Sequence, residues 1–491
     1  MLPIVSIVLA TLLVGTVATF FSGARARWTA LATAIAFLAE TALLFYDYAG
    51  WPGYNGALVP GFAETETHAW IHLPWLQINY AVGVDGISLV LILLTAILQI
   101  ATVLYSWGES KRPGAYFGLV GLTCLGSVGV FVALDVLLFF LFWEAVLVPM
   151  FFLIGVWGGP RRRYAALKFF VYTHVASIVM LVGLLAVVFY SGSTSFDFAS
   201  IYASARGLSP VLQTFLFLAM FFGFGVKFPI VPFHTWLPDA HVEAPTGGSV
   251  LLAGLLLKLG GYGLIRWAVE ILPQGFAHAR PILLAVALVS IVWGSVVSLA
   301  QRDMKRLVAY SSINHMGIVL LAIALNSSLG LLAAVLLMFA HGIVSALLFM
   351  TAGSLHHTYG TRDLSALGGI TPSTPTLSTL IMAGSLASLG LPALISFPAE
   401  FAALLATWNA IGYWVFVPLI ILVVTAAFYL WMMQRLLFGP PRDVPPAVHD
   451  VPWYEGVGMG LLVVFAVVFG ILPSLLVNVI ANSPVKGFPG T

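Results

Sequence analysis

The sequence predicts an all-α protein that crosses a membrane many times, and two observations predict it. Of the 491 residues, 61% are hydrophobic and only 8% are charged, whereas about a quarter of the residues of a soluble domain carry a charge. The apolar residues also gather into segments of roughly 18 to 25 residues, which are long enough to span a bilayer as helices. The net charge of +2 indicates no nucleic-acid partner.

About 14 such segments follow one another along the chain. They lie near residues 2–22, 28–48, 84–106, 114–132, 134–157, 166–190, 211–229, 246–268, 281–300, 307–325, 329–354, 376–407 (with a break), 413–434 and 455–480. No basic cluster precedes the first segment, so it is expected to be a retained helix and not a cleaved signal peptide. The single cysteine, Cys124, excludes a disulfide or a cysteine-ligated iron–sulfur cluster within the chain.

The basic residues predict how these segments are oriented. If the amino terminus lies outside, thirteen Lys and Arg residues fall in inward loops, and only Arg206, Arg266, Arg280 and Lys486 fall outside. The long early loop at about 49–83 contains neither Lys nor Arg. Because inward loops are enriched in these residues, both termini are predicted to lie on the outer (periplasmic) side of a bacterial inner (plasma) membrane.

Five charged residues are expected inside the spans: Lys227, Lys258, Glu40, Glu144 and Glu400. Such a charge costs about 2.5–3.5 kcal/mol on insertion scales and is a functional-site hypothesis by default. A structural ion pair is the alternative, and it is the interpretation favoured for Glu40, which lies near a helix end. Glu144 stands between FFLFW and AVLVP, where snorkelling to an interface is difficult, so a functional role is favoured.

The first of two interrupted spans ends at Lys227. Pro229 and Pro232 follow it, and Pro229 removes the hydrogen bond to the carbonyl of Gly225. Freed carbonyls at membrane depth are tolerated only where they are buried in protein or line a wet cavity. The prolines are therefore expected to open a polar pocket for Lys227, with Glu144 as a partner whose proton affinity depends on that of the lysine.

The second interrupted span, LGLPALISFPAEFAALLAT, carries Pro392 and Pro398 just before Glu400. Corresponding breaks in two halves of a chain point to a transport site in an inverted-repeat fold. Five spans separate the two breaks, so each repeat would contain five helices. A unit with an odd number of spans ends on the opposite side of the membrane from where it begins, so the second copy is inverted relative to the first. The sequence thus predicts two inverted five-helix repeats, each with one broken helix, in which Lys227 corresponds to Glu400.

Two histidines on consecutive spans are predicted to be stations of a proton relay. They are His315 in SSINHMGIVLLAI and His341 in MFAHGIVSALLFM. Imidazole titrates near physiological pH and can exchange a proton at either ring nitrogen. The alternative is a hydrogen-bonding packing role, but intramembrane Lys258 and Glu400 beside these spans favour the relay.

The other histidines carry weaker predictions. His234 and His241 flank the first break, and a relay role and a packing role both remain open for them. His174 has no clear partner, so a packing role or a side hydration site is expected. His356 and His357 are adjacent and would diverge on a helix, and no H-x-x-x-H or H-E-x-x-H pattern occurs, so no metal site is predicted.

The quoted motifs that follow resemble the antiporter-like subunits of respiratory complex I. They are AVGVDGISLVLILLT, GVKFPIVPFHTWLPDAHVEAPTGGSVLLAGLLLKLGGYGLIR, RDMKRLVAYSSINHMGIVLL and MFAHGIVSALLFMTAGSL. The resemblance runs from about residue 75 to the last span. FPAEFAALLATW resembles the M-type (chain 4) subunit, which has glutamate where its sister chains and most Mrp-type relatives have lysine. Glu400 decides this subtype.

The resemblance implies a fold of 14 helices in four parts: residues 1–107 with the first three helices, repeats at 108–269 and 270–437, and a last helix in 438–491. It implies that Glu144 and Lys227 form the charge pair of the first half-channel. Lys258 would be the central lysine, which passes protons through His315 and His341 toward Glu400 as the exit-side group.

The function that the resemblance implies is proton translocation in the membrane arm of a redox-driven NADH:quinone oxidoreductase. The chain itself would hold no redox cofactor; FMN, iron–sulfur clusters and quinone are expected in partner subunits, and sister antiporter-like chains are expected beside it. The alternatives are a Mrp-type cation/proton antiporter subunit and the same chain type in a hydrogenase- or ferredoxin-linked complex. A passive scaffold is disfavoured because it would gain nothing from the cost of the buried charges.

Overall fold

The computed structural model describes residues 3–49, 62–73, 76–440 and 448–483. The α-helices are α1 (Ile4–Phe21), α2 (Ala26–Ala49), α3 (Gly86–Tyr105), α4 (Pro113–Val132), α5 (Val136–Ala145), α6 (Leu147–Trp157), α7 (Arg162–Tyr190), α8 (Phe198–Ser204), α9 (Pro210–Lys227), α10 (Trp236–Glu243), α11 (Thr246–Leu251), α12 (Leu257–Gly263), α13 (Pro273–Leu299), α14 (Met304–Ala324), α15 (Ser328–Tyr359), α16 (Pro375–Ser388), α17 (Ser396–Ile411), α18 (Phe416–Leu436), α19 (Trp453–Ile471) and α20 (Ser474–Ala481). The remaining elements are the 3₁₀ turns η1 (Gly23–Arg25), η2 (Ala205–Gly207) and η5 (Gly412–Val415), the π-helical segments η3 (Leu252–Leu256) and η4 (Leu264–Val269), and the strands β1 (Ala63–Leu73) and β2 (Leu76–Val84).

The helices confirm the predicted multi-pass membrane fold. Within the described residues, thirteen stretches are long and apolar enough to cross a membrane. One of them, Ser396–Leu436, has 41 residues and holds both α17 and α18, whereas a single span needs about 20 residues. When these two helices are counted separately, the total is the 14 that the sequence predicts.

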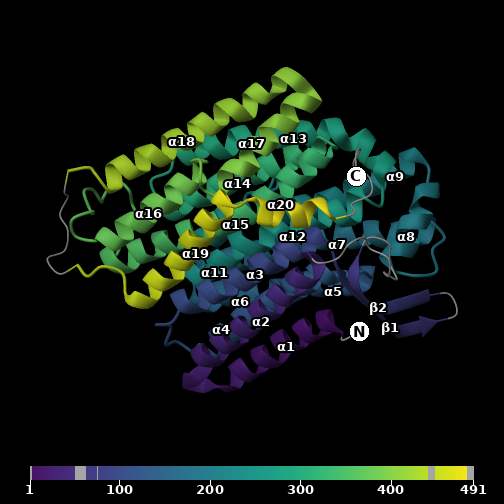
Figure 1. Ribbon diagram of the computed structural model, residues 1–491, viewed down its shortest axis with the longest axis horizontal. Coiled ribbons are helices and arrows are strands. Elements are labelled where there is room, and N and C mark those ends of the chain that lie inside the picture. Colours follow the sequence, from purple (N-terminus) through teal and green to yellow (C-terminus); the bar gives the residue numbers. More distant parts are fainter. Residues whose placement is uncertain (1–2, 50–61, 74–75, 441–447, 484–491) are drawn as a thin grey trace.

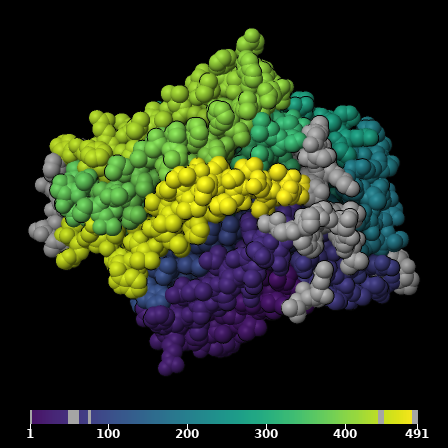
Figure 2. Space-filling view, in the orientation of Figure 1, coloured from purple at the N-terminus to yellow at the C-terminus, as the bar shows by residue number. Residues whose placement is uncertain are grey.

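The spans form a buried centre and a surrounding layer. Thr246–Val269 is buried around its whole circumference, and α14 and α15 are buried almost as completely. The helices lie side by side, with the β-hairpin at one end of the bundle (Figure 1). Figure 2 shows α19 and α20 between the N-terminal helices and α16–α18. We call the end with β1 and β2 the hairpin side, and the end whose loops carry Arg161, Arg302 and Arg362 the basic side.

The hairpin is an element that the all-α prediction omits. β1 and β2 pair antiparallel on the hairpin side. Glu66 of β1 accepts hydrogen bonds at Oε1 from the backbone N–H groups of Val5 and Ser6 at 3.0 and 3.1 Å. These N–H groups belong to the first turn of α1 and have no partner within the helix. The hairpin therefore caps α1, and the carboxylate is favourably placed at the positive end of the helix dipole.

The first broken helix satisfies its carbonyls differently from the prediction. α9 ends at Lys227, but the carbonyl of Gly225 accepts from the N–H of Ile230 at 3.3 Å. The carbonyl of Val226 accepts from the indole N–H of Trp236 at 2.9 Å. The prolines thus end the helix as expected, but these two carbonyls are bound within the chain and do not line an open pocket.

The second break depends on a glycine. α16 ends at Ser388, and Gly390 follows with a φ of +76°, a conformation that favours glycine. A Cβ placed on Gly390 would lie 2.3 Å from Oε2 of Glu400. Only a residue without a side chain lets this carboxylate pack against the turn, so the break itself sets the position of Glu400.

A buried ion cluster joins the hairpin side to the C-terminal segment. Arg266 donates from Nη1 to Oε1 of Glu270 at 2.7 Å and from Nη2 to Oδ2 of Asp85. Ser483, which follows α20, donates to the same oxygen of Asp85. Arg266 is 2% exposed and lies inside the span Thr246–Val269. It lies at the hairpin-side end of that span, and its carboxylate partners let the charge be buried.

Replacing Arg266 with methionine is expected to destabilise the protein by about 3–5 kcal/mol, because the substitution leaves a buried carboxylate without its cation. The measurement is the thermal unfolding midpoint of the purified protein. Arg206→Met is the control, since Arg206 is exposed and stacks on Tyr202. Equal midpoints for the two variants would contradict the prediction.

Candidate functional site

Lys227 is held at the end of α9 by the helix opposite. Its Nζ donates to the carbonyl of Trp143 in α5 at 3.0 Å and lies 3.7 Å from the centre of the indole ring. The side chain is buried, and both contacts are of kinds that stabilise an ammonium group. The lysine therefore reaches out of the broken helix toward α5, where the next residue is Glu144.

Glu144 has a closer partner than the predicted one. Its Oε2 lies 2.7 Å from Nδ1 of His174 in α7, whereas no ion pair within 4 Å joins it to Lys227 in the described chain. Glu144 and Lys227 still interact electrostatically through space. The expectation that His174 has no clear partner is wrong. The only signal for the pair in the sequence is that both residues lie within consecutive spans.

The Glu144–His174 pair faces the lateral surface of the bundle. The side chains are 21% and 41% exposed. Exposed apolar residues surround the pair: Leu141, Val148, Val171, Val175 and Ile178. A carboxylate and an imidazole at this position would be costly against lipid. The second Glu144 oxygen, Oε1, is buried and has no hydrogen-bond partner.

Lys258 lies at the centre of the most buried helix. It belongs to α12, between the π-helical segments η3 and η4, and is fully buried. π-Helical turns displace the regular backbone bonding and are frequent at functional sites. Here Nζ of Lys258 donates to the carbonyl of Ala253 within η3 and lies 2.7 Å from Nδ1 of His341.

His341, His315 and Glu400 continue the line from Lys258. The ring centres of His341 and His315 are 5.4 Å apart. Nδ1 of His315 lies 2.8 Å from the carbonyl of Ser311 and must carry a hydrogen, because a carbonyl only accepts. The other ring nitrogen of His315, Nε2, lies 3.5 Å from Oε1 of Glu400.

We call these four residues together the central line: Lys258, His341, His315 and Glu400. All four are 5% exposed or less. They come from α12, α15, α14 and α17, so residues from 258 to 400 of the chain converge in one row. The predicted members are thus brought together, and His341 stands next to Lys258 while His315 stands next to Glu400.

Two small cavities flank the last steps of the central line. One, of about 10 Å³, is lined by both His341 and His315 and by the hydroxyl-bearing residues Ser311, Ser345, Ser388, Ser396 and Tyr429. This volume admits about one water molecule. The other, also about 10 Å³, touches Glu400, and Thr407 is the one hydroxyl residue in its otherwise apolar lining. Sequence reasoning did not find these hydroxyl residues, because serine and threonine are common in membrane helices.

The histidines at the first break differ from each other. His234 accepts at Nε2 from the indole N–H of Trp293 at 3.1 Å, so this nitrogen carries no hydrogen. His241 is fully buried, stacks on Phe349 with ring centres 4.3 Å apart, and has no hydrogen-bond partner at either ring nitrogen. Lys258 is one of the charged groups that act on His241. Both ring nitrogens of His241 are thus without a hydrogen-bond partner in the described chain, whereas His234 is held by Trp293.

Glu40 lies apart from these groups. Its Oε1 accepts from the hydroxyl of Thr11 in α1 at 2.6 Å. Within the described chain, no contact joins it to the central line. The partner of Glu40 is thus a hydroxyl and not the cation of an ion pair, and its structural role stays a prediction.

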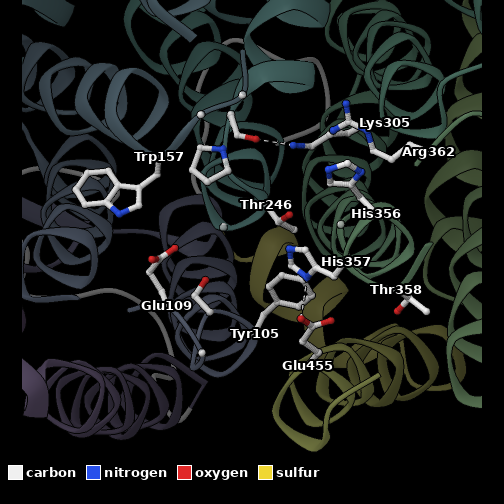
Figure 3. Close-up of a pocket in the computed structure, with 18 of the residues that line it drawn as sticks. Tyr105, Glu109, Trp157, Thr246, Lys305, His356, His357, Thr358, Arg362 and Glu455 are labelled. Carbon is white, nitrogen blue, oxygen red and sulfur yellow. Dashed lines mark hydrogen bonds and ion pairs between the residues drawn. The ribbon is translucent and has the colours of Figure 1, made fainter. Parts of the chain in front are cut away.

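The basic side is hollowed by a cavity of about 1030 Å³ (Figure 3). Its walls come from α3, α15, α19, residues 157–160 and residues 242–247. Lys305, in its wall, donates from Nζ to the carbonyl of Ala244 at 2.6 Å. The cavity therefore reaches the start of the helix that carries Lys258. In the part of the chain that the structure describes, no group of three or more His, Cys, Asp or Glu could hold a metal ion.

Comparisons with known proteins agree with this geometry. A family described as NADH:quinone oxidoreductase/Mrp antiporter, transmembrane, matches residues 133–428. The chain is 39% identical to F420H2 dehydrogenase subunit M of Methanosarcina mazei, over 98% of this chain and 97% of that one. It is 38% identical to NADH-quinone oxidoreductase subunit M of Rhodobacter capsulatus, over 94% and 90%. Among solved structures, a chain of respiratory complex I from Thermus thermophilus superposes with a TM-score of 0.86 at 28% identity, over 99% and 100%.

Proposed function

The chain belongs to the NADH:quinone oxidoreductase/Mrp antiporter transmembrane family, as a subunit of the M (chain 4) type, and from this premise we propose that the central line is its proton path. It is a proton-translocating membrane subunit of a complex I-type oxidoreductase. The observation that carries the assignment of the path is that four buried titratable side chains stand in series, each next to another.

The geometry supports a stepwise transfer. Lys258, as an ammonium, gives a proton to Nδ1 of His341 across 2.7 Å and becomes a neutral amine. His341 releases its other proton, on Nε2, and one water in the small polar cavity carries it to Nε2 of His315. His315 then passes this proton to the carboxylate of Glu400 at 3.5 Å. Each group gains and loses one proton, and the line returns to its starting charge once Glu400 releases its proton and Lys258 is reloaded.

Glu144 and Lys227 are the proposed input pair of the first half. The electrostatic interaction between them makes the charge of one depend on the charge of the other. His174, bonded to Glu144, is a further group that can hold the proton of this pair. His241, with both ring nitrogens unpartnered, is the proposed station between the first break and Lys258, and His234 remains a weaker proposal.

The two broken helices support the proposed repeats at 108–269 and 270–437. Each range contains five spans, and the broken one is the fourth in each. In this scheme Lys227 and Glu400 occupy corresponding places, and Glu400 is the exit-side group. The N-terminal part at 1–107 and the last part at 438–491 lie outside the repeats.

Partner subunits are proposed to supply the other parts of the respiratory complex. The chain is one subunit of a multi-subunit respiratory complex. The half-exposed Glu144–His174 pair within an apolar lateral surface supports a sister membrane subunit at that face. No redox cofactor is assigned to this chain; FMN, iron–sulfur clusters and quinone belong to partners in this proposal.

The orientation is proposed from the basic loops. Twelve of the thirteen Lys and Arg residues predicted to lie inward belong to the described residues, and they fall in loops or helix ends on the basic side; Arg442 lies outside the described residues. Such residues favour the inner face of the membrane. The hairpin side would then face outward, with α1 beginning there and α20 ending there. A bacterial plasma membrane as the location stays a prediction.

The electron donor is the point on which the relatives differ. The Methanosarcina mazei relative is an F420H2 dehydrogenase subunit, and the Rhodobacter capsulatus relative is an NADH-quinone oxidoreductase subunit. We propose NADH as the donor of the parent complex, with a reduced deazaflavin as the second candidate. Oxidation of one donor and not the other by membranes that contain the chain decides between them. A Mrp-type antiporter role is disfavoured, because these relatives are oxidoreductase subunits.

The proposed input pair is tested by Glu144→Gln in the assembled complex. We expect proton uptake per electron in proteoliposomes to fall about tenfold or more, because the amide fits the site but cannot hold the proton. Glu40→Gln is the matched control, since Glu40 is an intramembrane carboxylate that bonds to Thr11 and lies apart from the central line. Pumping by an assembled Glu144→Gln complex at the level of the control would exclude Glu144 from the path.

A further inference from the structure

We propose that the basic-side cavity is a proton intake for Lys258, and that His357, Glu455, Ser354 and Tyr105 conduct the proton from the cavity into the bundle. This proposal rests on the proposed function of the central line. The route reaches Lys258 without passing through Glu144 and Lys227, and pumping requires both this route and that pair. The residues come from α15, α19 and α3.

The entrance is an imidazole–carboxylate pair in the cavity wall. Nδ1 of His357 lies 2.9 Å from Oε1 of Glu455, and Figure 3 shows the two side chains meeting at the cavity. The His357 side chain is 54% exposed, whereas that of Glu455 is 6% exposed. One member of the pair therefore meets the solvent of the cavity, and the other lies inside the protein.

A chain of hydroxyls leads inward from this pair. Ser354 donates from Oγ to Oε2 of Glu455. The Tyr105 hydroxyl lies 3.2 Å from Oγ of Ser354 and 3.1 Å from the carbonyl of Met350. Ser354 and Tyr105 are 0% and 4% exposed, so both are buried, and Tyr105 borders the inner wall of the same cavity.

The hydrogen-bonded row of Glu455, Ser354 and Tyr105 has a place for one additional proton. If Glu455 is ionised, Ser354 uses its only hydrogen on the carboxylate. The single hydrogen of Tyr105 is then required by two acceptors, Ser354 and the Met350 carbonyl. If Glu455 carries a proton, it can donate to Ser354, Ser354 to Tyr105, and Tyr105 to Met350. Every contact then has its own hydrogen, so these contacts can accommodate one additional proton as it passes.

The Tyr105 hydroxyl ends at the helix that leads to Lys258. It contacts the hydroxyl of Thr246, the first residue of α11. A Cβ on Gly353 would lie 2.3 Å from Oγ1 of Thr246 and 2.5 Å from the Tyr105 hydroxyl. The absence of a side chain at Gly353 thus lets the two hydroxyls meet between α3, α11 and α15.

Polar residues of α3 continue from Tyr105 to the depth of Lys258. Thr102, Gln99 and Thr95 are each 2% exposed or less, and the spacing of four and three residues places them on one face of the helix. Oε1 of Gln99 is buried and has no hydrogen-bond partner. At a rise of 1.5 Å per residue, Thr95 lies about 15 Å deeper than Tyr105, and Lys258 about 18 Å deeper than Thr246.

α3 also packs directly on the helix that contains Lys258. A Cβ on Gly254 would lie 2.4 Å from Cδ1 of Leu98, the neighbour of Gln99. A Cβ on Gly247 would lie 3.1 Å from Cγ2 of Thr102. The polar face of α3 therefore borders α11 and η3, between the cavity and the central line.

The proton balance of the route is simple. His357 takes a proton from cavity water on Nε2 and gives the one on Nδ1 to Glu455. Glu455 gives a proton to Ser354, whose own hydrogen moves to Tyr105, and the hydrogen of Tyr105 moves inward toward Thr246. One proton enters and one leaves at each group, and neutral Lys258 takes up the proton at the end of the route.

The test uses the assembled complex in proteoliposomes and the variants Tyr105→Phe and Glu455→Gln. Each is expected to lower proton translocation per electron about tenfold or more. Tyr116→Phe is the matched control, because it removes another buried hydroxyl of the same cavity that bonds only to Ser106, at 3.0 Å. Ser354→Thr keeps a hydroxyl and is expected to retain activity within about twofold, whereas Ser354→Ala loses it.

Three results would overturn the intake. They are wild-type pumping by either assembled variant, an equal loss in Tyr116→Phe, and a loss explained by a smaller amount of the chain in the complex. The last two would make the network a structural contact between α19 and the bundle. Lys258→Met separates this outcome from failure of the proposed function: if it pumps normally, the central line itself is wrong. If it does not pump while Tyr105→Phe does, only the intake is wrong.

Discussion

Lys258→Met is expected to abolish proton translocation by the assembled complex. The ammonium is the group that loads His341, and methionine fills the space of the lysine without carrying a proton. The loss should reach about a hundredfold in protons moved per electron, the scale of removing a positioned proton-transfer group. It is measured as acidification of proteoliposomes against the rate of quinone reduction.

Lys258→Arg separates charge from proton exchange at the same position. Arginine keeps the positive charge but does not release its proton in proteins. We therefore expect it to impair pumping far more than its larger volume explains. Lys168→Met is the control, because Lys168 is a lysine paired with Asp239 at 2.6 Å on the basic side and lies outside the central line. Normal pumping by the arginine variant would make Lys258 a structural residue.

Glu400→Ala is expected to remove proton release at the far end of the central line. The carboxylate is the acceptor that stands 3.5 Å from Nε2 of His315, and alanine leaves no acceptor there. Movement of one proton against 100 mV costs about 2.3 kcal/mol, so a path without its last group cannot sustain the gradient. The measurement is the steady-state pH difference across proteoliposomes, with Glu40→Gln as the control for an intramembrane carboxylate off the path.

Glu400→Lys tests what the site requires of this residue. Lysine is the residue that the resemblance places here in the sister subunits. If the site needs only a titratable group, the lysine variant should retain substantial pumping while the alanine variant does not. The lysine side chain must also fit beside the turn at Gly390, which is packed against Oε2 of the native carboxylate. If the alanine variant pumps like the control, the exit lies elsewhere.

Much of the fold follows from local patterns in the sequence. The apolar segments predict the spans because a helix is the form in which a chain satisfies its own backbone groups in hydrocarbon. The breaks after Lys227 and before Glu400 are predicted because proline lacks an N–H wherever it stands. The hairpin was not predicted, since β1 is polar and exposed over most of its length and gains its role from capping α1.

The site was predicted as a set of residues, but not as a set of contacts. Lys258, His315, His341 and Glu400 were all identified from their charge or imidazole within apolar spans. The prediction for His174 was wrong, because its partner Glu144 lies on a neighbouring helix and nothing in either segment specifies which faces meet. Arg266 was counted among the outward basic residues, and its partners Asp85 and Glu270 were not recognised as a cluster.

The sequence by itself determined that the chain crosses a membrane many times, which charges lie inside it and where two helices break. These features depend on the cost of a charge or a missing N–H at one position, and that cost is the same whatever surrounds it. Only the tertiary structure decided that Lys258 meets His341, that His315 meets Glu400, and that Glu455 of α19 meets His357 at the cavity. These contacts join helices far apart in the chain, and they depend on helix packing and side-chain rotamers, which no local pattern encodes.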